Sequence, residues 1–141
     1  MSAPTAQHSY TIKEAAALTG ADVARNEQEM EVQARELLAL GARNVLIKGG
    51  HGDGSESIDL LVGEGDVLRL SAKRVDTKNT HGTGCTLSSA IAAGLAKGFD
   101  LKAAARAAKT YVTAAIAAAD TMPVGHGHGP LHHFHATWRT T

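Results

Sequence analysis

Apolar residues recur along this chain with distinct spacings, and each spacing predicts a different element. Between residues 22 and 40 they fall on one stripe at helical spacing, which predicts a helix capped by Asp22 and ended by Gly41. The stripe consists of Val23, Met30, Leu37 and Leu38, together with Ala24 and Ala34. The next segment, Asn44–Lys48, is a short apolar run without alternation, which predicts a strand buried on both faces, as in a parallel sheet.

Alternation of apolar and polar residues predicts an antiparallel hairpin after this strand. Its two strands are expected at residues 57–62 and 67–75, joined by the glycine-rich loop 63–66. Leu68 and Leu70 point to one side of the second strand, while the polar residues between and after them point to the other. The count of predicted strands is then three, which is few for an α/β sheet and indicates a compact fold or a piece of a larger one.

Capping residues and composition predict three further helices. A short helix at residues 11–18 has Glu14 in its first turn and a glycine just past its end. Two more are expected at about residues 84–97 and 101–119, where small side chains dominate and permit close packing. Residues 121–141 are rich in glycine and histidine, and we expect a tail with little regular structure.

The composition suits one domain, residues 1–141, and excludes two classes of partner. Fourteen basic residues balance fourteen acidic ones, so no global field attracts nucleic acid or an anionic membrane. Aromatic residues make up 4% of the chain, which leaves little surface for base stacking. The single cysteine excludes a disulfide framework, and no apolar run is long enough to cross a bilayer. We therefore expect a cytoplasmic protein.

The segment Asn79–Thr86 (Asn-Thr-His-Gly-Thr-Gly-Cys-Thr) carries the strongest chemical signal. Gly82 and Gly84 let the backbone approach a ligand closely because neither has a Cβ. A helix begins directly behind them, so its free N–H groups and its positive dipole end favour a phosphate at the turn. Cys85 lies in the same field, which favours its thiolate form. Without further context, the alternative is a tight helix entry that binds nothing.

Two further motifs give this turn its context. They are Lys48-Gly49-Gly50-His51, before it, and Gly127-His128-Gly129-Pro130, after it. In order and spacing the three motifs resemble the hydroxymethylpyrimidine/phosphomethylpyrimidine kinases of thiamine biosynthesis, in the ribokinase-like superfamily. The resemblance runs from about Thr11 to Phe134. Enzymes of that family are about twice as long, so the resemblance implies an α/β fold that is the C-terminal, ATP-binding half of a three-layer α/β/α domain with a truncated sheet.

The resemblance also implies a role for each candidate residue. The turn and the first residues of its helix form an anion hole for the γ-phosphoryl group in transfer, and Cys85 takes the position of the catalytic base. The implied catalytic residues are thus Cys85, Gly82 and Gly84, and the implied nucleotide- and phosphate-binding residues are Lys48, Thr80 and Thr83. Phosphoryl transfer depends mainly on positioning and charge neutralisation, which such a set supplies.

The implied cofactors are ATP and Mg²⁺, and the sequence departs from the family at the metal motif. The family reads Thr-Pro-Asn-x-Pro-Glu-Ala where this chain reads Ser-Tyr-Thr-Ile-Lys-Glu-Ala, residues 9–15. Glu14 is retained and is the implied magnesium ligand, while Thr11 replaces the asparagine and Lys13 replaces the second proline.

The implied function is ATP-dependent phosphorylation of hydroxymethylpyrimidine and its monophosphate, and alternatives stay open. The chain is otherwise a nucleotide-binding module that needs a separate N-terminal half, a ribokinase-like kinase for another small substrate, or an interaction fragment whose turn is empty. An open sheet edge would allow a homo-oligomer. The histidines gathered at residues 126–135 have no cysteine among them, so we interpret them as an adventitious metal site rather than a dedicated one.

Overall fold

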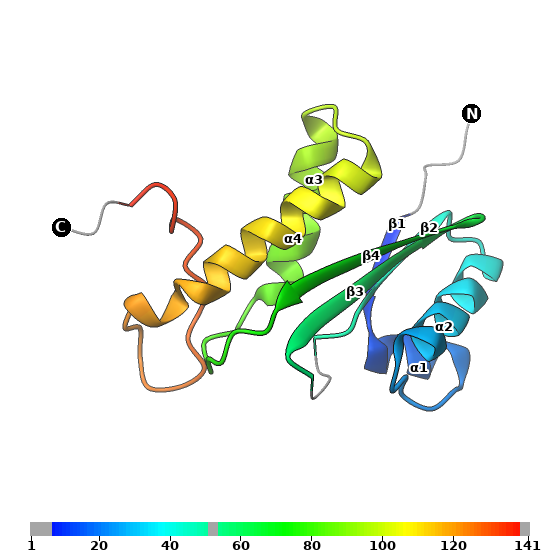
Figure 1. The fold of residues 1–141 in the computed structure, drawn as a ribbon, viewed down its shortest axis with the longest axis horizontal. Helices are drawn as coiled ribbons and strands as arrows, with labels where there is room; N and C mark the ends of the chain where they lie inside the picture. The colour runs from blue at the N-terminus through cyan, green and yellow to red at the C-terminus, as the bar shows by residue number, and fades with distance from the viewer. Residues whose placement is uncertain (1–6, 51–53, 139–141) are drawn as a thin grey trace. The chain divides into compact units, whose positions relative to one another are not determined.

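The computed structural model describes residues 7–50 and 54–138. The chain divides into two compact units, residues 1–71 and 72–141 (Figure 1). Its helices and strands follow in the order β1 (Gln7–Thr11), α1 (Ile12–Thr19), α2 (Glu27–Ala39), β2 (Asn44–Lys48), β3 (Glu56–Gly63), β4 (Asp66–Lys73), α3 (Thr83–Ala96), α4 (Leu101–Ala117) and the 3₁₀ turn η1 (Ala119–Thr121). His51, named in the sequence motif, lies outside the described residues.

The first unit is built on a mixed sheet with the strand order β1-β2-β3-β4. Strand β2 pairs in parallel with β1, Tyr10 opposite Ile47, and antiparallel with β3, Val45 opposite Val62. The prediction that β2 is buried on both faces is confirmed, since Val45, Leu46 and Ile47 are all buried. The count of three strands is wrong, because β1 is a fourth strand. The residues of β1 are mostly polar, so no apolar pattern predicts a strand there.

Two helices cover one face of this sheet, and their caps explain where they begin. Thr11 and Glu14 form a reciprocal capping box at the start of α1, as the position of Glu14 in the first turn suggested. The predicted start of α2 is wrong by four residues, because Asn26 and not Asp22 accepts the N-cap hydrogen bond, from the backbone N–H of Glu29. The core of the first unit combines Ile12, Ala15, Ala24, Met30, Ala34 and Leu37 with the strand residues Val45, Ile47, Leu60 and Val62.

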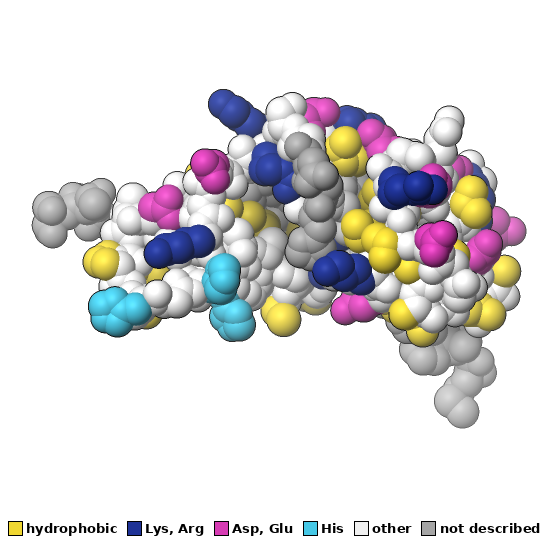
Figure 2. Space-filling view, turned by 90° about the horizontal axis from the view of Figure 1, so that it is seen from below, with side chains coloured by type: hydrophobic (Ala, Val, Ile, Leu, Met, Phe, Trp, Pro, Cys, Tyr) yellow, Lys and Arg dark blue, Asp and Glu magenta, His cyan; other side chains and the backbone are white. Residues whose placement is uncertain are grey.

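The hairpin prediction is confirmed with small changes at its ends. Strand β3 runs from Glu56 to Gly63, and β4 ends at Lys73 rather than at residue 75. On β4, Leu68 and Leu70 are buried while Arg69 is exposed and forms ion pairs with Glu27 and Glu56. In Figure 2 charged side chains of both signs are interspersed over the face drawn. No helix among the described residues is long and apolar enough to cross a membrane.

The second unit is a pair of helices, α3 and α4, followed by an irregular segment that packs against them. Asp100 caps α4 through the backbone N–H of Ala103, as predicted. The helices approach closely where Gly94 faces Ala104. The segment after η1 has little regular structure, as expected, yet it is not loose: Leu131 is fully buried, and the backbone N–H of His132 donates to the carbonyl of Ala115 at 3.1 Å.

Candidate functional site

The glycine turn, residues 80–82, ends at a residue in the left-handed conformation, and helix α3 follows directly. Gly82 is the N-cap, with φ 86° and ψ 5°, and no side chain caps the helix there. A side chain at this φ would be strained, because L-residues avoid the left-handed region. The helix begins at Thr83, one residue earlier than predicted, so Gly84 and Cys85 lie in its first turn.

The first turn of α3 presents backbone donors toward the turn. The hydroxyl and the backbone N–H of Thr83 both donate to the carbonyl of Thr80, at 2.7 and 3.3 Å. The N–H of Thr86 donates to the carbonyl of Gly82, while those of Gly84 and Cys85 have no acceptor within the described part of the chain. Such free N–H groups at a helix N-terminus favour an anion. The structure therefore brings Thr80, Gly82, Thr83, Gly84 and Cys85 together, as the sequence predicts.

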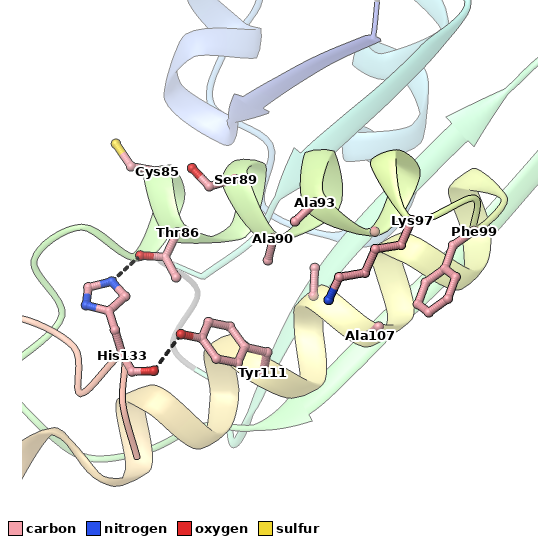
Figure 3. Close-up of a pocket in the computed structure, with 12 residues that line it drawn as sticks. Cys85, Thr86, Ser89, Ala90, Ala93, Lys97, Phe99, Ala107, Tyr111 and His133 are labelled. Carbon is pink, nitrogen blue, oxygen red and sulfur yellow. Dashed lines mark hydrogen bonds between the residues drawn. The ribbon is translucent and has the colours of Figure 1, made fainter. Parts of the chain in front are cut away.

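Cys85 is exposed at one end of a groove between α3 and α4. Beside it, the hydroxyl of Thr86 and Nε2 of His133 are hydrogen-bonded at 2.9 Å, and the hydroxyl of Tyr111 donates to the carbonyl of His133 at 2.7 Å (Figure 3). The groove has a volume of about 680 Å³ and is lined by Cys85, Thr86, Ser89, Ala90, Ala93, Gly94, Lys97, Phe99, Ala107, Ala108, Tyr111 and His133. Most of these side chains are small. The groove therefore offers few polar groups between Thr86 and His133 at one end and Lys97 at the other.

The other two candidates, Lys48 and Glu14, belong to the first unit. Lys48 ends β2, with Thr11 opposite it on β1. The backbone N–H of Thr11 donates to the Glu14 carboxylate at 2.8 Å, which holds the pKa of Glu14 below its ordinary value, and the charge of Lys48 acts in the same direction. Glu14 is therefore ionised at neutral pH and already serves as a helix cap. No group of three metal-ligating side chains occurs among the residues that the structure describes, and this includes the histidine-rich segment.

Sequence reasoning assigned no role to two polar residues, Asp59 opposite Lys48 and Asn79 directly before Thr80. Asp59 is buried opposite Lys48 in the sheet, and its Oδ1 accepts from the backbone N–H of Gly49 at 3.2 Å. A carboxylate within the apolar strand 57–62 was the signal that could have pointed to it. Asn79 bonds both to Asp120 and to Gly129, some 40 to 50 residues away, and no local pattern could reveal that.

Comparison with known proteins decides the family. Residues 11–132 match the family model described as phosphomethylpyrimidine kinase. The chain belongs to this family. It is 52% identical over 128 residues to the hydroxymethylpyrimidine/phosphomethylpyrimidine kinase of Rhizobium meliloti, covering 91% of this chain and 48% of that protein. The Escherichia coli kinase of the same name is 51% identical over 127 residues, covering 90% of this chain and 48% of the protein.

Solved structures give the fold. The Bacillus subtilis pyridoxal kinase in complex with ADP superposes with a TM-score of 0.85 at 36% identity, over 91% of this chain and 48% of that one. The Staphylococcus aureus pyridoxal kinase in complex with AMP-PCP gives 0.87 at 29% identity, over 93% and 48%. The predicted fold class, part of a ribokinase-like α/β domain, is confirmed. The chain spans about half the length of the relatives it matches.

Proposed function

We propose that this chain supplies the nucleotide-phosphate site of a kinase that phosphorylates hydroxymethylpyrimidine and its monophosphate in thiamine biosynthesis, with ATP as the donor. The observation that carries the proposal is identity of about one half, along nearly the whole chain, to kinases of that name. We treat residues 1–141 as a single partial kinase domain, of which 121–141 is a glycine- and histidine-rich C-terminal segment. The proposed cellular location of this kinase is the cytoplasm.

The proposed anion hole is the turn with the first residues of α3. The free backbone N–H groups of Gly84 and Cys85 lie where they can donate to a phosphate oxygen, and Gly82 leaves room for it because its missing Cβ has no neighbour within 4 Å among the described atoms. The carbonyl of Thr80 is occupied by Thr83, which holds the turn closed behind the phosphate. Donors fixed in advance stabilise charge without a reorganisation cost at the moment of transfer.

Cys85 is the proposed base that accepts the proton of the substrate hydroxyl. Its thiol is exposed and lies in the first turn of α3, beside the proposed anion hole. As the hydroxyl oxygen attacks the γ-phosphorus, its proton passes to Sγ, and the bond from phosphorus to the ADP leaving oxygen breaks. Lys48 is the proposed cationic contact of the nucleotide phosphates, a role that suits a mobile ammonium group.

Glu14 is the proposed protein ligand of Mg²⁺. The residues fit this use, because Mg²⁺ is commonly held by one or two carboxylates together with substrate phosphates, and Glu14 is an exposed carboxylate with a lowered pKa. Its Oε2 accepts from the backbone N–H of Thr11 at 2.8 Å. When bound, Mg²⁺ would neutralise phosphate charge during transfer.

Two observations keep further candidates open. Since the chain spans about half of its relatives, it is alternatively a nucleotide-binding module that requires a complementing N-terminal half, or that self-associates along the β1 edge of its sheet. Several structural relatives are pyridoxal kinases, one of them solved with AMP-PCP and pyridoxal, which favours a kinase for another small substrate as the second candidate.

The test is a titration of the purified chain with MgATP, followed by melting temperature. At about 100 times the Kd, binding stabilises the folded state by about 2.7 kcal/mol. Gly82→Val should abolish the shift, whereas Gly98→Val, which introduces the same strain at φ 89° on the far side of α3, should keep it. A wild-type chain without any shift at millimolar MgATP would refute a nucleotide site formed by this chain alone. Turnover of hydroxymethylpyrimidine against pyridoxal, with and without an added N-terminal half, then separates the candidates.

A further inference from the structure

The glycine turn has little to hold it in place from within. Thr80 and His81 are both exposed, and Gly82 caps α3 without any side-chain hydrogen bond. The local bonds are those from the N–H of Thr80 to Lys78 and from Thr83 to Thr80. A turn that must keep its N–H groups aimed at one point needs support from outside itself.

The side chain of Asn79, directly before the turn, is fixed at both ends of its amide. Its Oδ1 accepts from the backbone N–H of Gly129 at 2.9 Å, and its Nδ2 donates to Oδ1 of Asp120 at 2.8 Å. Reversing the amide would place a donor against the N–H of Gly129 and an acceptor against a carboxylate, so only one orientation is satisfied. Asp120 in turn accepts from the hydroxyl of Thr77, which receives the backbone N–H of Asn79 at 3.1 Å.

The same distant segment also holds the turn directly. The carbonyl of Gly129 accepts from the backbone N–H of His81 at 3.2 Å, and Pro130 pairs with His81 as a parallel bridge. Gly129 is buried, and a Cβ there would overlap the amide of Asn79. The backbone pairing of His81 and the hydrogen bond to the Asn79 side chain thus join residues 79–81 to residues 129–130, and Gly129 takes part in both.

We propose that Asn79 is a positioning residue that orients the turn Thr80–Gly82 for phosphate binding, through its paired hydrogen bonds to Asp120 and Gly129. Asn79 does not touch the nucleotide; it acts through the turn and through Gly129. The inference rests on the proposed nucleotide site. It assigns to the hydrogen bonds of Asn79 the function of holding the turn in the conformation that binds phosphate.

Exchanging the two polar groups tests this. Asn79→Asp keeps the acceptor for Gly129 but loses the donor to Asp120 and places two carboxylates side by side. Asp120→Asn in the same chain restores a donor–acceptor pair, with the amide on the other residue. Because Thr77 and Asn79 share Oδ1 of Asp120, the new amide nitrogen in that place also donates to the hydroxyl oxygen of Thr77. We expect Asn79→Asp to weaken MgATP binding at least about tenfold and the double variant to recover most of that loss. Asp100→Ala, which removes the cap of α4, is the control that destabilises the same unit without touching the turn.

A second measurement separates this inference from the proposed function. Hydrogen exchange at the backbone N–H of His81, in the chain without nucleotide, reports whether the turn is held. Asn79→Asp should accelerate it, the double variant should slow it again, and Asp100→Ala should leave it unchanged relative to the rest of the unit. If wild type binds no MgATP, the proposed site fails, and the exchange data alone still decide the role of Asn79. Unchanged exchange in Asn79→Asp, or a double variant no better than the single one, overturns the inference.

Discussion

The close crossing of α3 and α4 makes a quantitative prediction, because Gly94 leaves no room for a methyl group. A Cβ at Gly94 would lie 2.9 Å from the Cβ of Ala104 and 3.2 Å from its Cα. Carbon atoms pack at about 3.5–4.0 Å, so the helices would have to separate by about 0.6 Å or more. Overpacking of this kind costs about 1–3 kcal/mol. Replacing a mid-helix glycine by alanine returns about 1 kcal/mol, so Gly94→Ala should be neutral to destabilising by about 2 kcal/mol.

A double-mutant cycle separates the clash from the helix propensity. Ala104→Gly removes the opposing methyl group, so Gly94→Ala should cost at least about 1 kcal/mol less in that background than in wild type. The free energy of unfolding is measured by urea titration with far-ultraviolet circular dichroism. Ala107→Gly is the matched control, because this exposed position on α4 carries the same propensity change and should be additive with Gly94→Ala. Additivity in the Ala104→Gly background as well, within about 0.5 kcal/mol, would refute the close crossing.

Three further predictions concern the cap of α1 and the contact between Gly129 and Asn79. Thr11→Ala should destabilise the chain by about 1 kcal/mol in urea titrations, since it breaks the capping box of α1. The folded-state pKa of Glu14 lies below its ordinary value of 4.5, so ionised Glu14 stabilises the folded chain. Glu14→Gln should therefore lower the free energy of unfolding above pH 4.5, and this loss should vanish as the pH falls through the folded-state pKa. An equal loss at neutral and at acidic pH would contradict this. Gly129→Ala should destabilise by about 1–2 kcal/mol through loss of the Asn79 hydrogen bonds, whereas Gly127→Ala, with nothing within 4 Å of its added Cβ, should change stability by less than about 0.5 kcal/mol, both read from thermal melts.

Elements with a strong local pattern could be predicted from the sequence almost to the residue. Strand β2 and helix α4 begin where they were expected, because a run of apolar residues and an aspartate cap are signals contained within the segment itself. The start of α2 failed for the opposite reason. Asp22 and Asn26 are both competent caps, and the choice between them depends on the turn that Glu29 stabilises by accepting from the backbone N–H of Arg25.

Strand β1 could not be found because its evidence lies elsewhere in the chain. Its five residues carry no alternating apolar pattern, and what makes them a strand is the parallel ladder with β2, some 37 residues later. Parallel pairing is a tertiary interaction, and a polar segment can adopt it once a neighbouring strand offers its free edge. The sequence therefore predicts three strands where the structure has four, because local patterns do not reveal a polar strand that forms by tertiary pairing.

The candidate site shows the same division between local and distant determinants. Gly82, Thr83, Gly84 and Cys85 are contiguous, so their grouping at the start of a helix follows from the sequence alone. The groups that surround them come from the segment expected to be an unstructured tail: Gly129 reaches Asn79 across 50 residues, and His133 reaches Thr86 across 47. Glycine, proline and histidine forecast irregular backbone correctly, but irregular backbone can still be fixed when its polar groups find partners. The glycine turn at residues 80–82 is accordingly held by two segments of the chain, of which the sequence motif is only one.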